Sequence, residues 1–269
     1  MCWQKRFDSE NPDKDIEEKI NTVFNEHNGR YGYRRITATL RDCSIVINQK
    51  KVRRIMKKLG LKCVAFSHKS RKYNSYRGIV GNIADNKIKR RFKTSIPHQK
   101  ITTDTSEFKI YTTDNDGKLK IKKLYLDPFL DMFNGEVLSF SISDRPNFKS
   151  INDALEKAIN ITNDCPYRRT FHSDQGWAYQ MNVYTKKLNK NKIFQSMSRK
   201  GTCLDNSPME NFFGIIKQEM YYGKIYKTFN ELELAIKEYI YYYNNKRIKE
   251  KLNWLSPVNY RVEYESKIA

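Results

Sequence analysis

The chain has 269 residues, 39% of them hydrophobic, which is enough for one sizeable core and a smaller satellite domain. Lysine and arginine total 51 against 30 acidic residues, which gives a net charge of +21. An AT-rich coding sequence could account for some of the lysines. A surplus of this size nevertheless indicates a polyanionic partner, and nucleic acid is the leading candidate. No stretch is apolar enough to cross a membrane and no signal peptide opens the chain, so we expect a cytoplasmic protein without a membrane partner.

Three short helices are expected near the amino terminus, in a domain placed at residues 1–63. Apolar residues recur there at helical spacing, with Gly29 suited to close the first helix and Asn48 suited to cap the third. The expected helices cover residues 13–29, 33–42 and 48–61.

The third of these helices is rich in cations. Its apolar stripe, which should be buried, consists of Val52, Ile55, Met56 and Leu59. Three short helices of which the last is basic favour a helix-turn-helix module that binds DNA, and a solvated basic face is the alternative. The expected DNA-binding residues are Arg53, Arg54, Lys57 and Lys58.

Residues 64–98 are expected to form a basic linker between two domains. They mix cations with Tyr, Phe and Gly and show little periodicity. Interleaved aromatic and guanidinium groups suit a segment that follows a phosphate backbone and orders on contact, whereas a plain connector is the alternative.

The remainder of the chain, residues 99–269, predicts an α/β domain. Residues 101–111 are rich in β-branched and aromatic side chains, which is typical of a strand, and Asp104 lies within them. Turn residues at 114–117 lead into a second strand, so the two should form a hairpin. A third strand, a helix and a short strand are expected at residues 136–143, 148–162 and 170–176.

Three acidic residues form the candidate catalytic site. Clustered carboxylates repel one another, so such a cluster makes sense when cations neutralise it. Two divalent ions, Mg²⁺ or Mn²⁺, can hold the attacking and leaving oxygens of a phosphoryl displacement, and such hard ions prefer oxygen ligands. The expected catalytic residues and metal ligands are Asp104, Asp174 and Glu210.

The local sequence suggests where two of these acids lie. Asp174 should end a short strand, where open α/β sheets bind their ligands. Glu210 should lie near the start of a helix that Asn206 or Ser207 can cap. Each acid alone could be a surface or turn residue, and the residues alone leave two rival ligands open, Asp127 and Asp131.

Several strings, taken in order, resemble the orfB-type transposases of bacterial insertion sequences, relatives of retroviral integrases: TDTSEFK, LYLDPFLDMFNGEV, HSDQGWAYQ, NSPMENFFGIIK and YYNNKRIKEKLNWLSPVNYR. The resemblance covers nearly the whole chain and implies an RNase H-like core with a mixed sheet. It implies a metal triad of Asp104, Asp174 and Glu210, with 35 residues between the last two. It puts Asp131 at an aspartate outside that triad, and the chain departs from the family at Ile101, where Trp is common.

The resemblance also bears on partners. It implies a helix-turn-helix-like region carrying the string YGYRRI, and a small upstream orfA-type protein joined by frameshift fusion. A homo-oligomer is expected on DNA. Near the acids, the cations expected to hold phosphates are Arg199, Lys200 and Lys217.

The remaining sequence features are the carboxy-terminal segment and the spacing of the cysteines and histidines. Residues 229–248 predict an amphipathic helix, and Pro257 is expected to end regular structure. Five cysteines without a C-x-x-C pair, and four histidines without zinc-type spacing, indicate neither a disulfide framework nor a zinc site.

These observations predict a DNA transposase that cleaves element ends and transfers the freed 3′-hydroxyl to another strand. One rival is an RNase H-like nuclease that shares the acids but performs no strand transfer. The other rival is a DNA-binding remnant whose acids have decayed.

Overall fold

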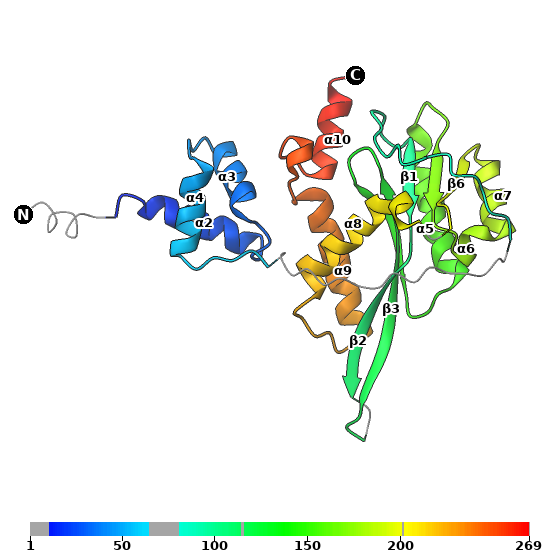
Figure 1. Ribbon diagram of the computed structural model, residues 1–269, viewed down its shortest axis with the longest axis horizontal. Helices are drawn as coiled ribbons and strands as arrows, with labels where there is room; N and C mark the ends of the chain where they lie inside the picture. Colours follow the sequence, from blue (N-terminus) through cyan, green and yellow to red (C-terminus); the bar gives the residue numbers. More distant parts are fainter. Residues whose placement is uncertain (1–10, 65–80, 114–115, 201, 269) are drawn as a thin grey trace, which may run out of the picture. The chain divides into compact units, whose positions relative to one another are not determined.

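A computed structural model describes residues 11–64, 81–113, 116–200 and 202–268. The chain divides into two compact units, residues 1–68 with 249–254, and residues 69–248 with 255–269 (Figure 1). In the described part of the chain, no helix is long and apolar enough to cross a membrane.

The amino-terminal unit contains the three expected helices, α2 (Lys14–Glu26), α3 (Tyr33–Asp42) and α4 (Gln49–Lys58). The side chain of Asn48 accepts a hydrogen bond from the Lys50 N–H at 2.8 Å, which confirms the predicted cap. One detail was wrong: Leu59, expected in the buried stripe, lies after the end of α4 and is 37% exposed. The rest of that stripe is buried: Val52, Ile55 and Met56.

The second unit is built on one mixed six-stranded sheet. The long strand β3 (Leu119–Asp131) pairs antiparallel with β4 (Val137–Ser143) along one edge. Along its other edge β3 pairs antiparallel with β2 (Ser106–Thr113) and then with β1 (Lys100–Thr103). The predicted hairpin is therefore present as β2 and β3, which project beyond the other strands in Figure 1; residues 114 and 115 of its turn lie outside the described residues.

Strands β1 and β2 share one register against β3, but they are separate strands. Thr103 pairs with Phe129, and Ser106 pairs with Leu126, so Asp104 would face Pro128. Proline has no N–H to donate to the ladder, which accounts for the interruption at this point. Asp104, predicted inside a continuous strand, therefore lies in the break between two strands.

On the far side of β1, the sheet continues in parallel with β5 (Thr170–Ser173) and β6 (Phe194–Met197). One face of the sheet packs on α5 (Phe148–Ile161), α6 (Trp177–Gln180) and α7 (Asn182–Lys190). This core includes the strand residues Ile101, Phe129 and Phe171, all at most 2% exposed.

The opposite face carries α8 (Ser207–Ile216) and α9 (Phe229–Asn245). Ile101 points into the core beneath α5, while the next residue, Thr102, bonds to Asn206 at the start of α8. Successive strand residues point to opposite faces, so α8 and α5 cover different faces of the sheet. A short π-helix, η3 (Lys217–Tyr221), continues α8.

The last helix, α10 (Pro257–Ser266), corrects a prediction. Pro257, expected to end regular structure, instead begins this helix. The side chain of Ser256 accepts a hydrogen bond from the Asn259 N–H, and proline fits the first turn because no helical acceptor is available there for an N–H.

Of the predicted linker, residue 64 and residues 81–98 lie within the described residues, and 65–80 fall outside them. Residues 81–98 contain no helix or strand but follow β6, the edge strand of the sheet. The Ala84 N–H lies 3.4 Å from the sulfur of Met197, and the Lys87 N–H donates to the Ser196 hydroxyl. These contacts cover a strand edge that would otherwise be open to other chains.

A buried ion pair joins η3 to the end of α9. The Arg247 guanidinium donates to both carboxylate oxygens of Glu219 at 2.6–3.0 Å, and the Tyr239 hydroxyl donates to the same carboxylate at 2.8 Å. Arg247 is 4% and Glu219 6% exposed. Neither residue stands out in the sequence, so the pair was not predicted.

We predict that Arg247→Met lowers the free energy of unfolding by about 3–5 kcal/mol, because the Glu219 charge stays buried without its main partner. Urea unfolding measures this. The matched control is Lys237→Met in the exposed pair with Glu233, where we expect a change under about 0.5 kcal/mol. Equal effects of the two substitutions would contradict the importance of the buried pair.

Candidate functional site

The parallel pairing of β1 and β5 places two of the predicted acids together. Thr102 pairs with His172, so Asp104 and Asp174 lie two residues further on, each just beyond the carboxyl end of its strand. Because the two strands are parallel neighbours, these two residues lie at the same edge of the sheet, where the charge of Asp174 acts on Asp104. Asp174 is thus at a strand terminus, as predicted.

The third acid, Glu210, is brought to this edge by the start of α8. Asn206 precedes the helix, and its side chain accepts a hydrogen bond from the Thr102 hydroxyl and donates one to the Thr103 carbonyl. The expected cap is therefore incomplete: Asn206 occupies the cap position, but its side chain binds β1 and makes no capping bond to the helix. This contact attaches the first turn of α8, with Glu210, to the end of β1.

The pKa of Asp104 reflects how close the other acids lie to it. Burial first, then the charges of Asp174, Glu210 and Asp127, hold the pKa of Asp104 well above its usual range. A hydrogen bond from the Thr105 N–H, at 2.8 Å, only partly offsets them. The edge therefore concentrates negative charge, and no cation in the described part of the chain forms an ion pair with these acids.

Asp174 is held by the turn that follows it. The Gly176 N–H donates to its Oδ1 at 2.8 Å, while burial raises the pKa of this carboxyl. A Cβ on Gly176 would lie 2.9 Å from that same oxygen and 3.3 Å from the ring of Tyr179. The string DQGWAY therefore needs glycine at this position to keep the carboxylate in place.

The two rival acids have other roles in the structure. Asp131 is fully buried and accepts hydrogen bonds from the His98 and Phe133 N–H groups, so it closes a turn. Asp127, 2% exposed, accepts from the Thr105 hydroxyl, next to Asp104, and burial raises its pKa to about 6. Asp127 therefore adjoins the candidate site from the other face of the sheet.

His172 and one predicted cation belong to a structural network. The His172 ring bonds to the Ser196 hydroxyl and to the Asp205 carbonyl, each at 2.9 Å, and burial lowers its pKa. Arg199 forms a two-pronged ion pair with the buried Asp205 carboxylate, which Arg90 also contacts at 2.9 Å. Arg199 therefore holds the loop after β6, a role that the sequence did not reveal.

The other expected phosphate ligands remain predictions. Lys200 is exposed in the same loop as Arg199. The Lys217 ammonium, at the end of α8, lies 5.0 Å from the ring centroid of Phe108 on β2, in cation–π range.

The basic face of α4 is only partly neutralised. Its four expected DNA-binding residues are all exposed, but Arg54 pairs with Asp13 at 2.8 Å and Lys58 pairs with Glu17 at 2.6 Å. Arg53 and Lys57 have no ion-pair partner within the described ranges.

The donor chemistry of the edge fits a hard divalent cation. Carboxylate oxygens are the ligands that Mg²⁺ prefers, and a bound cation would remove the cause of the raised Asp104 pKa. As the side chains stand, no group of three His, Cys, Asp or Glu residues within the described chain is gathered closely enough to hold a metal ion.

Three residues that support the site were not predicted from the sequence to do so: Thr105, Gly176 and Tyr179. The buried Tyr179 hydroxyl lies 3.5 Å from the Thr103 hydroxyl, and burial, then the charges of Asp127, Asp104 and Asp174, raise its pKa. A signal was available, since a Gly-aromatic turn directly after Asp174 indicates a tight approach to that acid.

Three family models match the chain. One described as an HTH-like domain covers residues 10–69, and two described as integrase core domains cover residues 94–203 and 210–264. The two core matches span the sheet and all three predicted acids.

Relatives match over most of their length. The putative transposase InsK for insertion sequence element IS150 of Escherichia coli is 43% identical, over 93% of this chain and 84% of its own. An uncharacterized transposase-like protein of Haemophilus influenzae is 48% identical, over 85% and 99%. The transposase for insertion sequence element IS904 of Lactococcus lactis is 32% identical, over 91% and 92%.

We predict that Asp104→Asn stabilises the metal-free protein at pH 8 by about 0.5–2 kcal/mol, the gain that stabilising substitutions commonly give. The sign follows from the raised pKa: above it, the folded state must carry a charge that burial and neighbouring acids disfavour, and asparagine carries none. Urea unfolding in EDTA measures the gain. The control is Glu238→Gln on the exposed side of α9, and equal changes in the two variants would argue against repulsion at the edge.

Proposed function

Because the chain belongs to the family of insertion-sequence transposases with an HTH-like and an integrase core domain, we propose that Asp104, Asp174 and Glu210 catalyse its DNA cleavage and strand transfer. The observation that carries this proposal is the register of β1 against β5, which sets two of the three acids side by side. The raised pKa of Asp104 supports it, since carboxylates kept close together against their repulsion are typical of a functional site.

The proposal includes two divalent ions, Mg²⁺ or Mn²⁺, held by the three carboxylates. When bound, such ions would stabilise the charge that develops on the attacking and leaving oxygens of a phosphodiester. The chain's own residues orient these carboxylates: the Gly176 N–H fixes Asp174, the Thr105 N–H fixes Asp104, and Asn206 fixes the helix of Glu210. No covalent bond between protein and DNA is needed, because the DNA 3′-hydroxyl is itself the nucleophile of strand transfer.

Several further assignments belong to this proposal. Lys200 and Lys217 would contact phosphates near the acids as point charges, and Arg199 would do so with the guanidinium N–H groups that Asp205 leaves free. The basic face of α4 would contact DNA. The active form would be a homo-oligomer on DNA, with an orfA-type protein supplied upstream or by fusion, in the cytoplasm where its substrate is found.

Two rival functions can be distinguished by their reaction products. A nuclease without strand transfer would cut element-end DNA but would not join it to a target. A decayed remnant would bind DNA and cut nothing with any divalent ion.

We predict that Asp104→Asn, Asp174→Asn and Glu210→Gln each reduce cleavage and joining at least about 100-fold, since each removes several kcal/mol of charge stabilisation. DNA binding should change by less than about two-fold. The assay follows labelled element-end DNA joined to a target duplex with Mg²⁺ or Mn²⁺, with Glu238→Gln on the exposed side of α9 as the control.

The same variants test the metal separately. Mn²⁺ should raise the melting temperature of the wild-type protein, because it binds the folded state only, and should raise that of Asp174→Asn much less. Near-wild-type turnover in any of the three variants, or an identical thermal shift in Asp174→Asn, would contradict the assignment.

A further prediction concerns α4, where some of the exposed cations form ion pairs and others do not. Arg53→Ala with Lys57→Ala should flatten the slope of log affinity against log salt by about 1.8, as each phosphate contact adds about 0.9. Arg54→Ala with Lys58→Ala should flatten it less, because Asp13, which Arg54 shares with Lys51, and Glu17 partly neutralise those charges. Fluorescence anisotropy on element-end and random duplexes gives both slopes. Unchanged slopes in both double variants would make this face a solvated surface.

A further inference from the structure

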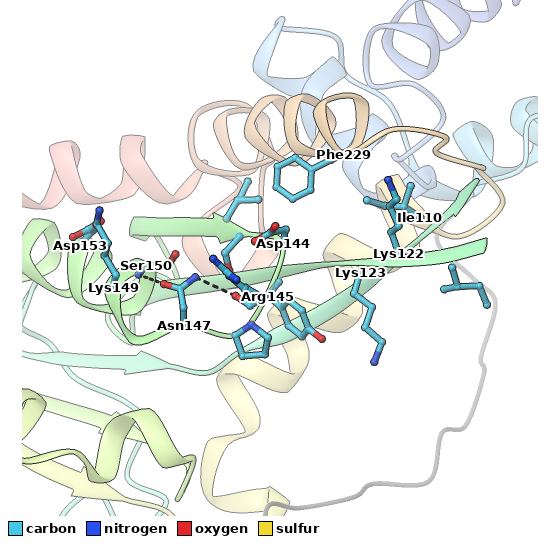
Figure 2. Close-up of a pocket in the computed structure, with 15 residues that line it drawn as sticks. Ile110, Lys122, Lys123, Asp144, Arg145, Asn147, Lys149, Ser150, Asp153 and Phe229 are labelled. Carbon is cyan, nitrogen blue, oxygen red and sulfur yellow. Dashed lines mark hydrogen bonds between the residues drawn. The ribbon is translucent and has the colours of Figure 1, made fainter. Parts of the chain in front are cut away.

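A large cleft lies on the second unit, next to the end of β4. Its volume is about 1170 Å³, and it is bounded by β3, the segment after β4, the start of α5 and Phe229 at the start of α9 (Figure 2). None of the three proposed catalytic acids lines it.

The lining of this cleft is basic. Lys122 and Lys123 come from β3, Arg145 from the loop before α5, and Lys149 from the first turn of α5, against two acids, Asp144 and Asp153. Lys123 pairs with Glu107 at 2.9 Å. The other three cations are exposed and, among the residues the structure describes, have no ion-pair partner.

Two polar features belong to the lining of the cleft. The Ser143 hydroxyl is buried in a residue only 8% exposed, and it has no hydrogen-bond partner in the described part of the chain. A buried hydroxyl without a partner costs free energy, so its presence calls for a ligand that accepts its hydrogen bond. Beside it, α5 begins: the Asn147 side chain satisfies only the Ser150 N–H, at 2.8 Å, and the preceding N–H groups of this 14-residue helix have no helical acceptor.

We propose that this cleft binds phosphates of the DNA backbone, as a second DNA site on the core outside the acidic edge. Three unpaired cations and a helix amino terminus match the charge of successive phosphates along a DNA backbone, and the buried hydroxyl can donate to an oxygen of one of them. The inference rests on the proposed function, since it assigns a place for the DNA on which the acids act.

The position along β3 allows one DNA molecule to reach both places. Lys122 lies six residues before Pro128, which faces Asp104, and a strand rises about 3.4 Å per residue, so about 20 Å separate them. Duplex DNA carries one phosphate per strand every 3.4 Å along its axis, or about six over this distance. A duplex held at the acidic edge and running along β3 would therefore reach the cleft.

The test compares two triple variants that lose the same charge. One carries Lys122→Ala, Arg145→Ala and Lys149→Ala, and the control carries Lys157→Ala, Lys186→Ala and Lys190→Ala, all exposed residues of α5 and α7. Binding of the full chain to fluorescent duplexes is measured in EDTA over a range of salt. The cleft variant should flatten the salt slope by about 2.7, and the control should leave it unchanged. A loss on element-end duplex alone identifies that DNA as the ligand, and an equal loss on random duplex identifies backbone contact without sequence preference.

Ser143→Ala provides a second variant that does not depend on charge. It should weaken DNA binding about ten-fold while leaving the melting temperature unchanged or higher, because the hydroxyl has no partner in the free protein. Cleft and control variants that bind DNA alike, together with unchanged binding by Ser143→Ala, would overturn the inference. If the wild-type protein itself neither binds nor cuts DNA, the proposed function fails instead, and the two failures are thus distinguishable.

Discussion

The parallel register of β1 against β5 is the constraint on which the site depends. It pairs Thr102 with His172 and so sends Asp104 and Asp174 out of neighbouring strands at the same level. The two carboxylates repel each other. The fold nevertheless keeps them together because the strands that carry them are buried: Ile101 and Phe171 are at most 2% exposed. Core packing therefore stabilises an arrangement that electrostatics alone would disfavour.

The remaining parts of the site are attached to this pair through backbone features. Pro128 interrupts the ladder opposite Asp104 and releases that residue from strand pairing. Asn206 gives up a capping bond to its own helix and binds β1 instead, which brings Glu210 to the edge. The site thus costs some local stability in a strand and in a helix, which is common at functional sites.

Much of the fold could be predicted from the periodicity of the sequence, whereas contacts between distant residues could not. The stripe of α4, the cap at Asn48 and the hairpin of β2 and β3 follow local rules and were predicted. The pairing of Glu219 with Arg247 joins residues 28 positions apart, and no local pattern reports it. The same holds for Arg199, whose partner Asp205 is buried by tertiary packing, and for Asp127, whose closeness to Asp104 depends on register. Pro257 was misread because proline both ends and begins helices.

The central claim is that one strand register builds a cation site from carboxylates that are distant in sequence. Anomalous diffraction from crystals grown with Mn²⁺ tests it most directly, because the ion itself is located. The account predicts Mn²⁺ bound to the carboxylates of Asp104 and Asp174, with Glu210 drawn toward it. Mn²⁺ bound elsewhere on the protein, with these carboxylates left without an ion at saturating concentration, would contradict it.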